Sequence, residues 1–90
     1  MHQEKFAQQL TDEGFDEVFT KTLPAKQRIA PHTHQFDVKA LVTDGEVTLG
    51  VDGQLTTYRV GEVFTMAKGC EHSELYGDAG VSYVVGRKHH

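Results

Sequence analysis

Two histidines one residue apart, His32 and His34, are the residues of this 90-residue chain whose type and spacing most directly indicate chemistry. Side chains alternate between faces along a strand, so an extended segment presents both imidazoles on one side. Pro31 favours that conformation, because its ring disfavours helical geometry at the preceding residue. Neutral imidazole is a good ligand for Zn, Ni, Fe and Cu. The pair could therefore hold one divalent transition-metal ion.

A third histidine follows a segment that reads as a glycine turn, a short apolar strand and a second glycine turn. Together, the two histidine-bearing segments resemble the two signature motifs of the cupin superfamily. The first motif is His-x-His, an acidic residue and a glycine; the second is a spaced pair of glycines followed by a histidine and, four positions later, an asparagine. The matching positions are His32, His34 and Gly45 in the first motif and Gly61, Gly69 and His72 in the second. The resemblance covers residues 26–85 and implies a small antiparallel jelly-roll β-barrel.

The chain departs from the cupin pattern at the acidic ligand. The resemblance implies a carboxylate at Val38 or Lys39, and neither residue has one. If both histidines of the first motif point inward, Asp37 points outward, and only a β-bulge would turn it toward a metal. The resemblance therefore implies a site of three histidines, His32, His34 and His72, with open positions. A decayed site that binds metal weakly or not at all stays an alternative.

Several neighbours of the histidines are candidates for the same pocket. Glu74 shares a strand face with His72 and could be a fourth ligand or a catalytic acid or base. The preferred interpretation of Glu74 is a solvent-facing strand residue, because glutamate is seldom buried without a partner. Tyr76 lies on that same face, where cupins have an asparagine. Phe36 and Val38 are predicted to line the pocket.

Cys70 precedes His72 by two residues and could approach the metal, although inert burial is the preferred interpretation. As the only cysteine, it excludes an internal disulfide and fits a reducing compartment, which predicts a cytoplasmic location. His2, His89 and His90 are left out of the site. The last two could be native or the remains of a purification tag.

Composition limits the classes of partner. The formal net charge of -4 and the absence of a long basic run argue against nucleic-acid binding. No apolar stretch approaches 18 residues, so no membrane partner is expected. Small size and the cupin resemblance predict a homodimer, with residues 15–23 as the candidate interface strand.

The pattern along the chain predicts an all-β fold with three parts: a short N-terminal helix or arm (1–14), the barrel (15–86) and a tail (87–90). Short strands at even spacing, divided by glycine turns and with no intervening helices, favour an antiparallel sandwich or barrel. Turns are expected at Asp44 and Gly45, at Asp52 and Gly53, and over residues 77–80.

Two functions stay open at this point. The first is a metal-dependent enzyme, of dioxygenase or isomerase type, that acts on a small organic molecule in the barrel. The second is a non-catalytic barrel that binds or senses a small molecule and has a weakened or lost metal site. The fold alone does not choose between them.

Overall fold

The computed structural model describes residues 3–89; His2 and His90 lie outside the described residues. The elements are one helix, α1 (Gln3–Asp12), and six strands, β1 (Glu17–Leu23), β2 (Arg28–His32), β3 (Phe36–Val51), β4 (Gln54–Arg59), β5 (Val63–Met66) and β6 (His72–His89). Every strand pair is antiparallel. The predicted all-β antiparallel fold with a short N-terminal helix is confirmed. Within residues 3–89, no helix is long and apolar enough to cross a membrane.

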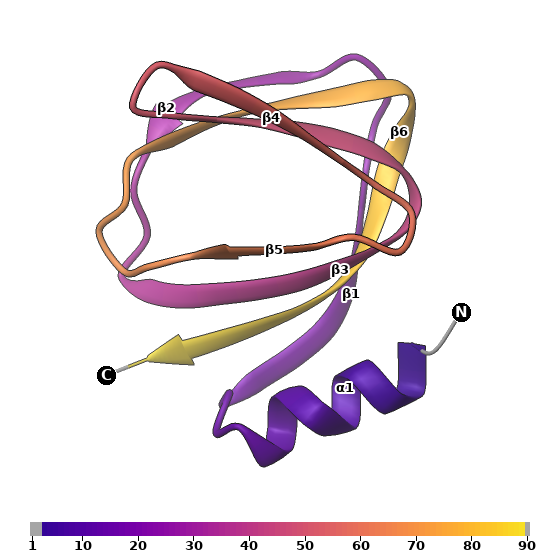
Figure 1. The fold of residues 1–90 in the computed structure, drawn as a ribbon, viewed down its shortest axis with the longest axis vertical. Helices are drawn as coiled ribbons and strands as arrows, with labels where there is room; N and C mark the ends of the chain where they lie inside the picture. The colour runs from indigo at the N-terminus through magenta and orange to yellow at the C-terminus, as the bar shows by residue number, and fades with distance from the viewer. Residues whose placement is uncertain (1–2, 90) are drawn as a thin grey trace.

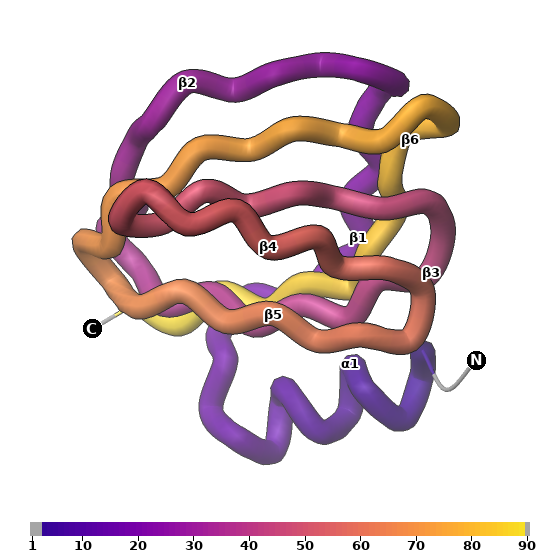
Figure 2. The backbone as a smooth tube through the Cα atoms, turned by 45° about the horizontal axis from the view of Figure 1, so that its top comes forward, coloured from indigo at the N-terminus to yellow at the C-terminus, as the bar shows by residue number. Residues whose placement is uncertain are grey.

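The two long strands, β3 and β6, pair with each other and bend, so that one sheet forms two layers (Figure 1). In one layer, the first part of β6 pairs with β2 and with the second part of β3, which in turn pairs with β4. In the other layer, the last part of β6 pairs with β1 and with the first part of β3, which pairs with β5. Figure 2 shows the layers facing each other across the interior, with α1 outside the second layer.

The turns expected at residues 44–45 and 77–80 are wrong as chain reversals, because β3 and β6 run through them as bends. The register of β3 against β6 shifts on either side of Gly45, which marks β-bulges that sharpen the bend. Gly45 has a φ of +68°, and a Cβ there would lie 2.1 Å from the carbonyl oxygen of Gly80. Only glycine allows the two bent strands to approach so closely.

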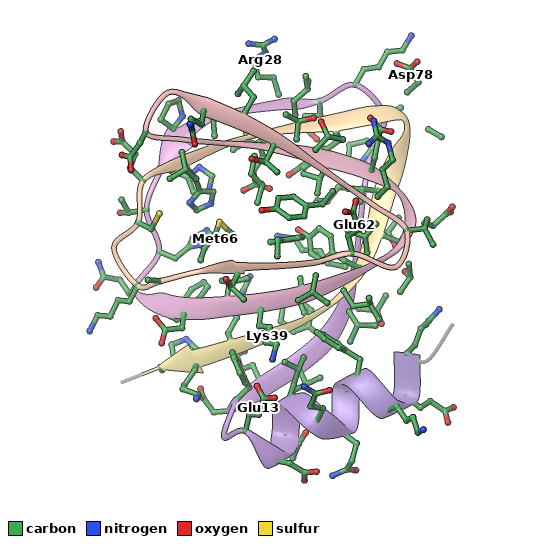
Figure 3. The ribbon with its side chains drawn as sticks, in the orientation of Figure 1. Glu13, Arg28, Lys39, Glu62, Met66 and Asp78 are labelled. Carbon is green, nitrogen blue, oxygen red and sulfur yellow. The ribbon has the colours of Figure 1, made fainter. Side chains whose placement is uncertain are left out.

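The core lies between the layers and is built from the inward residues of β3, β5 and β6. Its fully buried members include Ala40, Val42 and Val47. Met66 points into this space, whereas Lys39 and Glu13 lie on the α1 side of the sheet (Figure 3). The Lys39 Nζ is 3.0 Å from a Glu13 carboxylate oxygen.

A second apolar cluster fixes α1 to the outer face of the sheet. Phe6 and Leu10 of the helix pack against Leu41 and Val84, which are the outward residues of β3 and β6. These strands are therefore apolar on both faces. Their side chains alternate between the interior and the helix.

The predicted tail at 87–90 is wrong for its described part, because β6 continues to His89. Arg87 pairs with Val38 on one side and with Glu17 on the other. Gly86, at the predicted end of the barrel, lies under α1, where a Cβ would come within 3.0 Å of a helix side chain. The strand thus passes beneath the helix and beyond it.

Candidate metal centre

The three histidines of the sequence prediction meet at one edge of the first layer. His32 ends β2 and pairs in register with His72, the first residue of β6, while His34 follows β2 by two residues. The ring centres are 4.4 to 4.9 Å apart. One nitrogen from each ring lies within 4.8 Å of the others, a spacing that could hold a metal ion.

Two backbone carbonyls fix the orientation of two of these rings. The Nδ1 of His32 donates to the carbonyl oxygen of Ala30 at 2.8 Å, and the Nδ1 of His72 donates to that of Cys70 at 3.0 Å. A carbonyl only accepts, so each Nδ1 carries the proton. In the neutral rings, both Nε2 atoms therefore keep a free lone pair, as a metal ligand must.

Glu74 lies beside these lone pairs, so the interpretation of a solvent-facing glutamate is wrong. Its side chain is 12% exposed, with Oε2 3.2 Å from the Nε2 of His32 and 3.5 Å from that of His72. Its other oxygen accepts a hydrogen bond from the hydroxyl of Tyr76 at 3.1 Å. Strand alternation places Glu74 on the inner face between His72 and Tyr76.

The converging atoms of this cluster are all acceptors when the imidazoles are neutral. Two Nε2 lone pairs face a carboxylate oxygen, an arrangement that is repulsive unless a cation lies among them. The Nε2 of His72 and the Nδ1 of His34 are buried and have no hydrogen-bond partner. Such atoms are costly to bury unsatisfied. The residues present therefore fit a divalent metal ion; the alternative cation is a proton on one ring.

Burial holds His34 in its neutral, metal-binding form. Desolvation is the main cause that lowers the pKa of His34 below its ordinary value of 6.5, and the neighbouring His72 and His32 lower it further. The ring stacks on Phe36, with the ring centres 4.8 Å apart and the planes inclined by 8°. This contact also joins the histidines to the wall of the adjoining cavity.

A cavity of about 270 Å³ opens from the cluster into the space between the layers. Its lining includes the three predicted pocket residues, Phe36, Val38 and Tyr76. Tyr76 is 4% exposed, and burial, with the nearby Glu74, raises the pKa of its hydroxyl. The phenol therefore stays protonated at neutral pH and can donate to the carboxylate.

Two other candidates lie away from the cluster. The Asp37 carboxylate accepts a hydrogen bond from the backbone N–H of Lys68 at 2.7 Å. The bulges of β3 begin only after Val42, so no register shift turns Asp37 inward. Cys70 contributes its backbone carbonyl to His72, while its Sγ lies 3.8 Å from the Glu71 carbonyl oxygen.

Arg87 and Lys21 also line the cavity, and neither was predicted from the sequence. Arg87 was assigned to the tail. The alternation of Val81, Tyr83 and Val85 along the last strand continues to position 87 and would have placed Arg87 on the inner face.

The similarity of this chain to known proteins lies in its structure. No family model matches the sequence, and no curated protein matches it. A protein of unknown function from Rhizobium leguminosarum bv. viciae is 20% identical with a TM-score of 0.75, and the match covers 81% of this chain and 69% of that one. KdgF from Halomonas sp. is 13% identical with a TM-score of 0.66, covering 81% and 68%. An RmlC-like cupin from Shewanella frigidimarina is 17% identical with a TM-score of 0.65, covering 78% and 63%.

These similarities define the fold class of the chain. The chain has the cupin fold, as the sequence motifs predicted. It also contains a three-histidine cluster, His32, His34 and His72, that could bind a metal ion. At these identities the comparison shows the fold and leaves the activity open.

Proposed function

We propose that this protein binds one divalent transition-metal ion through His32, His34 and His72, with Glu74 as a fourth donor. The observation that carries the proposal is the convergence of free Nε2 lone pairs on a carboxylate oxygen. Histidine-rich ligation favours Zn, Ni, Fe or Cu over Mg or Ca. Glu74 would supply the carboxylate that the first motif lacks, from the other histidine-bearing strand.

We further propose that the bound metal serves an enzymatic reaction on a small organic molecule in the cavity. When bound, such an ion supplies Lewis-acid or redox chemistry at its open positions. Beside it, the Glu74 carboxylate and the Tyr76 hydroxyl form a hydrogen-bonded pair that could hold or move a proton. This pair favours an enzyme over the alternative of a barrel that only binds or senses a ligand.

Metal content tests the first proposal. Untagged protein, purified without a metal column, is dialysed against zinc, then against buffer, and measured by elemental mass spectrometry. We expect about one equivalent of zinc in the wild type and close to none in the triple variant His32→Ala, His34→Ala and His72→Ala. His89→Ala is the matched control, because it removes an exposed histidine and should keep the full equivalent. Equal zinc in the wild type and the triple variant would refute the site.

We also propose a homodimer formed through β1. Within residues 3–89, β1 pairs only with β6, and an edge strand of this kind can pair with a second chain. A small domain also gains buried surface by association. Sedimentation velocity at micromolar concentration tests the proposal, and a monomer would contradict it.

A further inference from the structure

The cavity beside the histidines contains an arginine that is held in place by aromatic rings. The guanidinium carbon of Arg87 lies 4.9 Å from the ring centre of Phe19 and 4.7 Å from that of Phe36. A cation over two ring faces is attracted to both. The guanidinium therefore has a defined position on the cavity wall, which reduces the entropy cost of binding a ligand there.

This arginine has no anionic partner in the described part of the chain. Apart from the histidines, the charged residues that line the cavity are Lys21, Arg87 and Glu74. Glu74 is engaged by the histidines and Tyr76. Within residues 3–89, no carboxylate lies within ion-pair distance of Arg87 or of Lys21. The half-buried guanidinium thus offers its N–H donors to the cavity.

The arrangement also links the arginine to the histidines, so that a ligand bound at one would extend toward the other. Phe36 contacts the guanidinium of Arg87 and stacks on His34, so one aromatic ring connects the two sites. Between the charged positions, the lining is largely apolar, with Phe64 and Met66 contributed by β5 and Val85 by β6. A ligand that matches this wall has an anionic end and a short carbon skeleton.

We propose that the cavity binds a small carboxylate, with the carboxylate group on Arg87 and the other end of the molecule directed toward the histidine cluster. The planar guanidinium matches a carboxylate through two parallel hydrogen bonds. Lys21 adds a second positive charge. A cavity of about 270 Å³ fits a molecule of a few carbon atoms up to one aromatic ring. The proposal deepens the proposed function and rests on it only for the contact with the metal.

Matched acids and amides test the proposal. Benzoate is compared with benzamide, and butyrate with butyramide, by NMR titration of metal-free and zinc-loaded protein. We expect at least one acid to bind about tenfold or more tightly than its amide, the size of effect that a charge-assisted pair produces. Arg87→Gln should abolish this preference. Arg28→Gln should keep it, because Arg28 is exposed and points away from the interior (Figure 3).

The acid-to-amide ratio separates recognition from a loss of structure, because a distorted cavity would weaken both members of a pair. Arg87→Lys keeps the charge and should retain part of the preference, and thermal melting checks that each variant is folded. Equal binding of acid and amide, no binding of either pair, or an unchanged preference in Arg87→Gln would overturn the proposal. Displacement of the acid by an equal concentration of inorganic phosphate would overturn the assignment to carboxylates. If the protein takes up no zinc but still shows an Arg87-dependent preference for the acid, the anion site is supported and the metal proposal fails.

Discussion

Two clusters in the described part of the chain each bring three potential ligand atoms within 4.8 Å of one another, and they differ in whether these polar atoms are already satisfied. His32, His34 and His72 form one cluster; Asp16, Glu17 and His89 form the other. In the second cluster all three residues are exposed. Its histidine ring pairs with both carboxylates, and the Asp16 carboxylate also accepts from the backbone N–H of His89.

The first cluster has the opposite character. His72 is 1% exposed, and its Nε2 has no hydrogen-bond partner. An exposed acidic cluster exchanges contacts with water at little cost, whereas a buried lone pair does not. Ligand spacing alone would rank the two clusters as equals. The unsatisfied atoms are what distinguish a candidate metal centre from a surface hydrogen-bond network.

The gain in stability on zinc binding should show the largest difference between a substitution in the first cluster and one in the second. Zinc at a hundred times its dissociation constant would stabilise the wild type by about 2.7 kcal/mol and raise Tm by roughly 11–22 °C. In His72→Ala the zinc-dependent shift should vanish, because the most buried ligand is lost. In His89→Ala it should persist in full. Calorimetry with and without zinc measures the shift, and a loss in His89→Ala would assign the metal to the exposed cluster.

A substitution at the helix contact should lower the stability of the fold without changing the metal site. Leu10 is fully buried between α1 and the outer face of the sheet, so Leu10→Ala should lower the free energy of unfolding by about 2–5 kcal/mol. The folded fraction should still bind zinc at the wild-type stoichiometry, because the helix and the histidines lie on opposite faces of the sheet. Urea titration and elemental analysis measure the two quantities. Loss of zinc from the folded variant would show that the site depends on the helix.

Substitution of Glu74 tests whether its carboxylate belongs to the metal site with the first cluster. Glu74→Gln keeps the shape but removes the charge beside the lone pairs of His32 and His72, and should weaken zinc binding by about 10- to 100-fold. Glu71→Gln is the matched control, because Glu71 is an exposed residue three positions earlier. Competition with a chromophoric chelator gives both affinities. Equal affinities would remove Glu74 from the metal site.

The sequence was sufficient to predict the parts of the site that follow from side-chain alternation along a strand or from motif spacing. Alternation along an extended segment predicted that Phe36 and Val38 share a face with His32 and His34, and both line the cavity. The cupin fold followed from two motifs with characteristic spacing.

The remaining features depend on contacts between segments that are distant in the sequence. Glu74 is on the inner face because Tyr76 and the histidines satisfy its oxygens, and a single sequence does not show those partners. Arg87 was missed because the expected strand stopped short of it, although pairing with β1 and β3 extends β6. The bend at Gly45 depends on the approach of Gly80, which lies on the other long strand.

The pH dependence of stability should show the smallest difference between the two clusters. His34 and Asp16 should affect stability in separate pH ranges. Burial lowers the pKa of His34, so in metal-free protein the unfolded chain takes up a proton near pH 6.5 before the native state does. Stability should therefore fall as the pH drops below about 6.5. The hydrogen bonds from His89 lower the pKa of Asp16 below its ordinary value of 3.8, so the contribution of Asp16 is lost only as the pH falls below that value.

Urea unfolding of chelator-treated protein at a series of pH values measures this separation. His34→Gln should flatten the loss of stability between pH 7 and pH 5.5, because the residue that resists protonation is gone. Asp16→Asn should lower stability by a constant amount across that range without changing the slope, and should flatten the loss of stability only below about pH 3.8. An equal slope in the wild type and His34→Gln would mean that His34 is not the group that couples folding to protons. The contrast between the buried and exposed clusters would then rest on metal binding alone.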